Sequence, residues 1–220
     1  MNGLLKTDKH QPYGPYERFV KRPQDFLCAL LAIIILSPVL LVVAILVRIK
    51  LGSPVLFKQE RPGRNGKIFK LCKFRTMLPP KDGIIDPKRD AERLTPFGEK
   101  LRATSLDELP ELFNILKGDM AVVGPRPLLM QYLERYNAHQ ARRHEVRPGF
   151  TGLAQTHGRN AIGWEEKFDW DVKYVDHITF LGDWKIIFQT VKIVLKREGI
   201  NGKSSATMSE FMGSQEKAEQ

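Results

Sequence analysis

The chain has 220 residues, and its 35 Lys and Arg against 25 Asp and Glu give a formal net charge of +10 at pH 7. This length suits one domain with a real core plus a membrane element, and it leaves too little room for two full domains. The positive charge predicts an anionic partner: a phosphate-rich substrate, nucleic acid or an anionic lipid surface. The two cysteines, Cys28 and Cys72, lie in an apolar and a polar segment, so we expect no disulfide framework and a cytosol-facing domain.

The first strong feature along the chain is an apolar segment. Residues 1–20 carry two prolines, two glycines and mixed charge and are expected to form a mobile cytosolic lead-in. Residues 21–50 are the predicted membrane helix, and their centre, Phe26 to Val47, holds 22 residues without a charge. At 1.5 Å per residue this is about 33 Å of helix, enough to cross a hydrocarbon core. Ser37-Pro38 lies near the middle, and proline removes a backbone donor, so we expect a break or bend there.

The charges on both sides of this segment bear on its topology. Residues 1–22 hold five basic side chains, and residues 48–75 hold nine against the single acid Glu60. Both ends therefore prefer the cytoplasmic side, which a re-entrant helix bent at Pro38 would satisfy. Because kinked prolines also occur in helices that cross the membrane, these physical arguments leave the re-entrant and spanning topologies open.

The next segments predict a β-hairpin. Residues 55–57 and 68–74 alternate enough to suggest short strands, and residues 61–66 contain the strong turn signals Pro62-Gly63 and Asn65-Gly66. Residues 79–88 form a polar loop rich in proline and glycine that connects elements or borders a site.

Residues 105–119 predict a short helix with adjacent acids at its start. Ser105 and Glu108 have the spacing of a capping box, and Gly118 lies where a helix would end. Leu106, Leu109 and Phe113 are the expected buried stripe. Asp107 and Glu108 would then lie in the first turn, which favours carboxylates and also attracts phosphate. Acids at this position are also ordinary capping chemistry, so the segment alone does not establish a catalytic role.

The second half of the chain predicts mostly helix. Residues 128–144 are expected to be helical, and Trp164, Phe168 and Val175 recur at helical spacing. A second apolar stripe runs from Trp184 to Leu195. Burial in the core is the simpler interpretation of these faces, and contact with lipid headgroups is the alternative. Residues 51–200 would form the catalytic domain, and the polar residues 201–220 a disordered tail.

Four ordered motifs resemble one family. They are Lys73-Phe-Arg75-Thr-Met77, residues 102–119, Gly124-Pro-Arg-Pro127 and Arg147-Pro-Gly-Phe-Thr-Gly-Leu-Ala-Gln155. Together they resemble the bacterial sugar transferase family, the small monotopic phosphoglycosyl transferases that move a phosphosugar from a UDP-sugar onto undecaprenyl phosphate. The resemblance extends from about residue 21 to residue 199, and it favours the re-entrant topology.

The resemblance also implies roles for individual residues. Asp107 matches the family's nucleophile, and Glu108 matches its metal-binding acid, which implies Mg²⁺ as cofactor. The implied phosphate- or substrate-binding residues are Lys73, Arg75, Arg102, Gly124, Pro125, Arg126, Pro127, Arg147, Gln155 and Arg159. Arginine suits this task because its planar guanidinium donates paired hydrogen bonds to phosphate oxygens.

The sequence therefore predicts a mostly helical α+β domain with a short β-hairpin, a re-entrant N-terminal membrane helix and amphipathic interfacial helices. Its expected activity is transfer of a sugar 1-phosphate, with an N-acetylated amino sugar favoured, to undecaprenyl phosphate, with release of UMP through a covalent aspartyl intermediate. The expected location is the cytosolic face of the bacterial inner membrane, and a homodimer is an expected assembly. The alternative is a membrane-anchored basic protein that binds anionic lipid or nucleic acid without catalysis. Nucleic acid is disfavoured because Asp107, Glu108 and Glu111 would lie in the middle of the basic surface.

Overall fold

We analysed a computed structural model of the chain, which describes residues 10–79, 90–158, 162–196 and 210–213. The described elements are helices α1 (Lys21–Leu51), α2 (Asp90–Arg93), α3 (Pro96–Ala103), α4 (Glu111–Lys117), α5 (Ala138–Ala141), α6 (Leu153–Thr156), α7 (Trp164–Asp176) and α8 (Phe180–Lys196), and strands β1 (Leu56–Pro62), β2 (Ile68–Phe74), β3 (Ala121–Val123) and β4 (Gly149–Thr151). A π-helical turn, Tyr16–Val20, precedes α1, so helical structure begins earlier than the expected start at residue 21. The prediction of a mostly helical α+β fold is confirmed.

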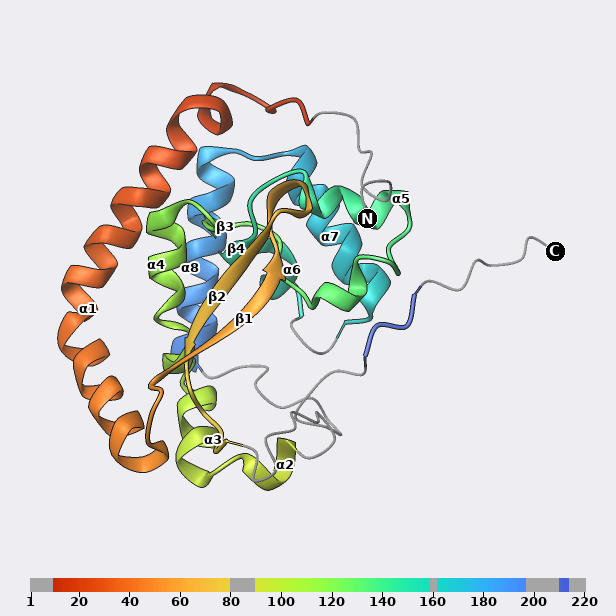
Figure 1. The fold of residues 1–220 in the computed structure, drawn as a ribbon. Coiled ribbons are helices and arrows are strands. Elements are labelled where there is room, and N and C mark those ends of the chain that lie inside the picture. The colour runs from red at the N-terminus through yellow and green to blue at the C-terminus, as the bar shows by residue number, and fades with distance from the viewer. Residues whose placement is uncertain (1–9, 80–89, 159–161, 197–209, 214–220) are drawn as a thin grey trace.

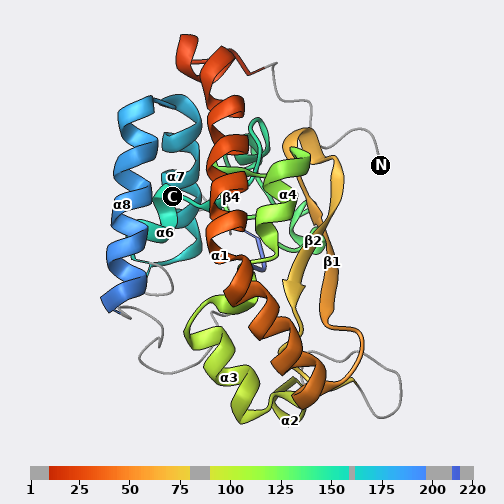
Figure 2. The same cartoon turned by 90° about the vertical axis from the view of Figure 1, so that its left-hand side faces the viewer.

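The strands form two small sheets. β1 and β2 pair antiparallel, with Leu56 opposite Phe74 and Pro62 opposite Ile68, which confirms the predicted hairpin. β3 and β4 pair in parallel, with Ala121 opposite Gly149. Figure 2 shows the hairpin on one side of α1 and α4, and α7 and α8 on the other.

Helix α1 runs along the domain for its full length. It is helical through Pro38, so the expected break at Ser37-Pro38 is a bend inside one helix, visible in Figure 2. The Ser37 hydroxyl donates to the Ile34 carbonyl at 2.8 Å, a back-bond typical of bent helices. Tyr16–Leu51 is long and apolar enough to cross a membrane.

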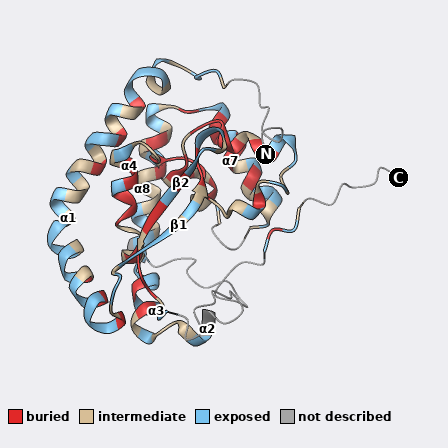
Figure 3. Cartoon of the chain, in the orientation of Figure 1, coloured by how far each residue is buried: buried red, intermediate tan, exposed pale blue. Residues whose placement is uncertain are grey.

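One face of α1 packs on the domain. Ala29 packs with Leu112 and Ile115 of α4, and Val47 packs with Phe74 of β2. The opposite face is exposed and apolar, as the pale blue outer side of α1 in Figure 3 shows, and it includes Leu31, Ile34, Ile35, Leu41, Val42 and Ile45. This face has no covering element among the described residues.

Much of the apolar stripe predicted along α8 is exposed rather than buried. Phe188, Val191 and Val194 are exposed, and the core is instead reached by Ile186. The simpler interpretation, that this stripe builds the core, is therefore wrong for these three residues, because α8 is turned so that Asp183 and Ile186 face the domain. It holds in part for Ile187, which packs partly buried against the core. α7 does bury Phe168 and Val175, as predicted.

Two further predictions need correction. Residues 128–144 do not form one helix: two 3₁₀ turns, Met130–Tyr132 and Arg142–His144, flank the four-residue α5, which starts at a capping box of Asn137 and Gln140. In the tail, residues 201–209 and 214–220 lie outside the described residues, but residues 210–213 are placed and Phe211 is buried. The loop predicted at 79–88 lies outside the described residues apart from its first residue.

Candidate active site

The adjacent acids lie on a tight turn between α3 and α4. Ser105 has a left-handed backbone (φ 56°) and reverses the chain, and Leu106–Glu108 then form the 3₁₀ turn η4. The predicted capping box is wrong: the Ser105 side chain caps nothing, because its left-handed conformation brings its carbonyl, not its hydroxyl, toward the Glu108 N–H at 3.2 Å. Pro110 separates η4 from α4, which therefore starts at Glu111.

This later start also moves the buried stripe. α4 buries Leu112 and Ile115, whereas Phe113 is 43% exposed. Leu106 and Leu109 pack partly buried beside Leu101. The predicted stripe is therefore confirmed in part at Leu106 and Leu109 and wrong for Phe113, since the helical phase does not continue across Pro110.

Glu108 is held by two cations. Lys73 from β2 donates to its Oε1 at 2.6 Å, and Arg126 donates to the same oxygen. Burial opposes ionisation of Glu108, but Arg126 and Lys73 outweigh it and lower its pKa to about 2. Glu108 is therefore a fixed anion at neutral pH.

Asp107 has a different environment although it is the next residue. It is 8% exposed, and no described residue donates a hydrogen bond to its carboxyl group. Burial and the neighbouring Glu108 charge raise its pKa to about 6, against the opposing pull of Lys73, Arg102 and Arg126. The result is a carboxylate that is mostly ionised at neutral pH and accepts no hydrogen bond from a described residue. Both properties would suit a nucleophile.

Glu111 is a third acid in the cluster, and the sequence analysis gave it no role in the site. It is 2% exposed, and Lys73 Nζ lies 3.1 Å from its Oε1. Burial raises its pKa to about 7, although Lys73 favours the ionised form. Its spacing three residues after Glu108, on the same side of a helical turn, was the available signal.

The loop Gly124–Pro127 carries Arg126 to the acids. A Cβ on Gly124 would lie 2.5 Å from the Arg147 carbonyl, so only glycine fits where β3 and β4 meet. Gly149 donates to the Pro125 carbonyl at 3.0 Å. At Gly149, too, two stretches of main chain approach each other closely, because a Cβ there would lie 2.1 Å from the Gly124 nitrogen.

A buried arginine that the sequence analysis missed fixes the same loop. Arg143 donates to the Arg126 carbonyl at 2.7 Å and to Asp171 of α7 at 2.8 Å. Arg61 also donates, to the Pro127 carbonyl at 3.4 Å. No local pattern indicates these long-range contacts.

The remaining predicted residues are not all brought to the acids. Arg102 donates to Thr76 Oγ1 at 2.9 Å and acts on Asp107 through its charge. Arg147 lies 3.7 Å from Asp25 of α1. Arg75 donates to the carbonyls of Ser53 and Leu51 at the end of α1.

Gln155 and Arg159 complete the predicted set. Gln155 donates to the Phe150 carbonyl at 3.4 Å, and its buried Oε1 has no hydrogen-bond partner among the described residues. Arg159 lies outside the described residues.

The residues present fit Mg²⁺ only if a substrate supplies further oxygens. No group of three or more His, Cys, Asp or Glu side chains in the described part of the chain could hold a metal alone. Both cations contact Oε1 of Glu108, and no described residue donates to its Oε2. Mg²⁺ usually binds one or two carboxylates plus phosphate oxygens, so Glu108 Oε2 beside Asp107 is a suitable ligand set.

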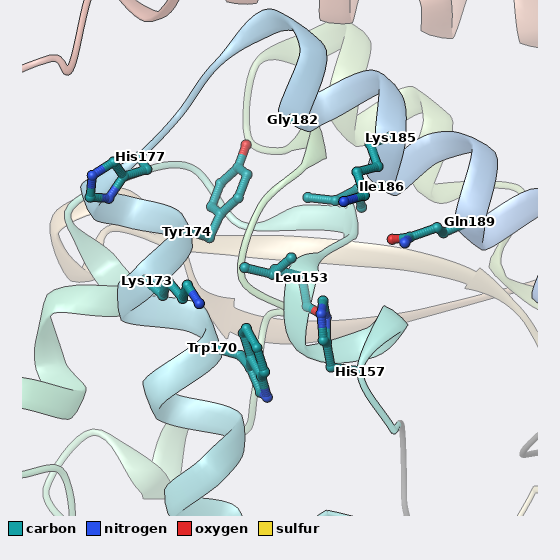
Figure 4. Close-up of a pocket in the computed structure, with 10 residues that line it drawn as sticks. All are labelled: Leu153, His157, Trp170, Lys173, Tyr174, His177, Gly182, Lys185, Ile186 and Gln189. Carbon is teal, nitrogen blue, oxygen red and sulfur yellow. The ribbon is translucent and has the colours of Figure 1, made fainter.

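A pocket of about 420 Å³ lies apart from these acids, between α6, α7 and α8. Figure 4 shows Trp170, Lys173, Ile186 and Gln189 around it. None of its lining residues belongs to the acid cluster. His157 stacks on Trp170 with ring centroids 3.9 Å apart, so this wall is preformed.

Comparison with known proteins gave one family. The chain matches the bacterial sugar transferase family over residues 16–197. It is 51% identical over 195 residues to the uncharacterized sugar transferase EpsL of Bacillus subtilis strain 168, and the match covers 89% of this chain and 96% of EpsL.

Two longer relatives have more specific names. The chain is 39% identical over 199 residues to the undecaprenyl-phosphate galactose phosphotransferase of Salmonella typhimurium strain LT2. It is 40% identical over 190 residues to the UDP-glucose:undecaprenyl-phosphate glucose-1-phosphate transferase of Klebsiella pneumoniae. These matches cover 83% and 82% of this chain, but only 42% and 41% of the two relatives.

Proposed function

Because the chain belongs to the bacterial sugar transferase family, we propose that it transfers a sugar 1-phosphate from a UDP-sugar to undecaprenyl phosphate and releases UMP. The resemblance predicted from the four sequence motifs is thereby confirmed. The relatives from Salmonella and Klebsiella are named for this type of transfer, with galactose and glucose as their sugars. The environment of Asp107 is the observation that carries the proposal.

Asp107 is the proposed nucleophile. One of its carboxylate oxygens attacks the sugar-bearing phosphorus, a new P–O bond forms, and the bond from this phosphorus to the bridging oxygen breaks, so UMP leaves with that electron pair. An oxygen of undecaprenyl phosphate then attacks the same phosphorus, and the bond to Asp107 breaks. The first step is supported by the absence of a described hydrogen-bond donor on Asp107, since nothing must be displaced before attack.

Glu108 and its cations prepare the site for a diphosphate. Lys73 and Arg126 already converge on Glu108, and Arg102 adds positive charge near Asp107. Preorganised cations stabilise charge that develops on phosphate oxygens. We propose that Glu108 Oε2 also binds Mg²⁺, which would neutralise the donor diphosphate when bound.

The placement of α1 supports a re-entrant helix. At its start Lys21 lies 2.5 Å from Asp183 of α8, and at its end Arg75 donates to the Leu51 carbonyl. Both ends are therefore fixed to the same domain. A helix that crossed the bilayer would separate its ends by a hydrocarbon core about 30 Å thick. The exposed apolar face of α1 and the outward stripe of α8 would then contact lipid on the cytosolic side.

Cysteine labelling tests this topology. In a chain whose Cys28 and Cys72 are replaced by alanine, single cysteines at Leu5 and Lys58 should both be protected from a membrane-impermeant reagent in intact cells. Reaction of only the Leu5 variant from outside would show that α1 crosses the membrane. Lys58 is exposed on β1, so its lack of reaction cannot be due to burial.

An assay of UMP release tests the activity itself. Membranes containing the protein are incubated with undecaprenyl phosphate and a panel of UDP-galactose, UDP-glucose, UDP-N-acetylglucosamine and UDP-N,N′-diacetylbacillosamine. We propose that an N-acetylated amino sugar is the donor, and preferred turnover of UDP-galactose or UDP-glucose would contradict this part. No release from any donor would favour the alternative, a membrane-anchored protein that binds anionic lipid without catalysis.

A further inference from the structure

Residues 210–213 lie against the catalytic domain and insert one aromatic ring into it. Figure 1 shows this blue segment beside α7. Phe211 is 2% exposed. Four rings surround it, with centroid distances between 4.9 and 5.8 Å. We call these four rings the aromatic cage; they belong to Tyr132, Tyr136, Trp164 and Phe168.

Polar contacts fix the segment in one register. Arg135 donates to Glu210 Oε1 at 2.8 Å and also to the Phe211 carbonyl. The Phe211 N–H donates to the Tyr132 hydroxyl at 3.3 Å. The next side chain, Met212, is 75% exposed. The segment is thus anchored specifically at Phe211 rather than resting loosely on an apolar surface.

The aromatic cage also encloses the arginine that holds the Arg126 loop. Arg143 lies 5.7 Å from the ring of Tyr136 and 5.6 Å from the ring of Phe168. Its Nη1 donates to the Tyr136 hydroxyl at 3.2 Å, and its Nη2 donates to the Arg126 carbonyl. Phe211 stacks on Tyr136 and meets Phe168 edge to face. Two of the four rings that Phe211 contacts, Tyr136 and Phe168, are therefore the rings that flank Arg143.

The chain on the other side of Arg126 reaches the same cage. Leu128 and Leu129 follow the loop directly and pack partly buried against the cluster that Tyr132, Phe168 and Phe211 form. The loop Gly124–Pro127 is therefore fixed twice, through the Arg143 hydrogen bond and through the packing of the residues after it. Both attachments depend on rings that Phe211 contacts.

We propose that Phe211 is a positioning residue for the transfer reaction: by filling the aromatic cage it holds Arg143, and through it the Arg126 loop, against Glu108. This rests on the proposed function, in which Arg126 balances phosphate charge. Removal of the ring opens the cage to water, and Arg143 gains freedom around Tyr136. Arg126 is then correctly placed beside Glu108 in a smaller fraction of the molecules. A misplacement of about 1 Å in such a group can lower the reaction rate about 100-fold.

The test compares Phe211→Ala, the conservative Phe211→Leu, and the control Met212→Ala in the full-length membrane protein. Phe211→Ala should lower kcat/KM for the UDP-sugar about tenfold, mainly through kcat, at a temperature well below its unfolding transition. Phe211→Leu should recover part of this loss, and Met212→Ala should match the wild type. Amide hydrogen exchange across residues 124–129 should be faster in Phe211→Ala only, whether or not a substrate has been identified.

A double-mutant cycle separates positioning from general destabilisation. In an Arg126→Lys background the loss caused by Phe211→Ala should shrink, because the group that Phe211 positions is already altered. Unchanged exchange at residues 124–129 together with unchanged kcat/KM would overturn the proposal, as would equal losses in both backgrounds. If the wild type releases no UMP while exchange still responds to Phe211→Ala, the proposed function fails and the coupling of Phe211 to the loop stands.

Discussion

Asp107 and Glu108 are adjacent in the chain, yet their environments move the pKa values of their carboxyl groups in opposite directions. Burial and the Glu108 charge raise the pKa of Asp107, whereas Arg126 and Lys73 overcome burial and lower that of Glu108. The short turn η4 makes this separation possible, because it points one carboxyl group at the two cations and leaves the other without a hydrogen-bond donor among the described residues. Divergent pKa values in neighbouring acids are typical of sites that assign them different roles.

The first prediction concerns Asp107→Asn. It should reduce UMP release at least about 1,000-fold, because an amide cannot form the acyl phosphate. The fold should persist, since Asp107 has no described hydrogen bond to lose and an amide is nearly isosteric. Mass spectrometry of the wild type incubated with UDP-sugar alone should find a phosphosugar on the peptide that contains Asp107. Glu99→Gln, an exposed acid on α3, is the control and should leave turnover unchanged. Near wild-type turnover by Asp107→Asn would disprove the covalent mechanism.

The second prediction concerns pH. The pKa of Asp107 is raised to about 6, so the ionised nucleophile is lost as the pH falls through that value. The value of kcat/KM should therefore be level above pH 7 and fall about tenfold for each unit below pH 6. The pKa of Glu111 is raised to about 7, so protonation of Glu111 would produce a similar fall in kcat/KM over the same pH range. Glu111→Gln separates the two: the acid limb should persist in this variant, and its disappearance would assign the limb to Glu111.

The third prediction concerns Lys73, which lies between two acids. Among the described residues, Lys73 is the one cation that forms an ion pair with Glu111 and one of the two that pair with Glu108, and Lys73→Met removes both contacts. Because the buried carboxylates then lose a positively charged partner, the free energy of unfolding should fall by about 1–3 kcal/mol. In Glu111→Gln the same substitution should cost less, because one of the two charges is gone. Equal costs in both backgrounds, measured by denaturant unfolding in detergent, would mean that the Lys73–Glu111 contact contributes nothing.

Local sequence patterns predicted those elements whose formation depends on residues close together in the chain. The turn at residues 61–66 with its flanking alternation gave the hairpin, and the uncharged run of Phe26–Val47 gave α1. The capping box failed because Ser105 adopts a left-handed backbone, which sequence spacing does not reveal. Arg143 and Phe211 were missed for another reason: the hydrogen bonds that join them to Arg126 and Tyr132 span 17 and 79 residues, so no short window contains the signal.

The last prediction distinguishes two roles for Arg75, which the motif resemblance placed among the phosphate-binding residues. In the structure its guanidinium donates to the carbonyls of Leu51 and Ser53, where α1 ends and its last carbonyls lack helical partners. Lysine supplies a single ammonium and cannot reproduce both planar contacts. Arg75→Lys should therefore lower unfolding free energy by about 1–3 kcal/mol and leave the KM for UDP-sugar unchanged. Lys70→Ala, on the exposed side of the same strand, is the control and should change neither quantity. A raised KM with unchanged stability would instead support a substrate-binding role for Arg75, because only the substitution of a residue that contacts the donor would weaken binding without loosening the end of α1.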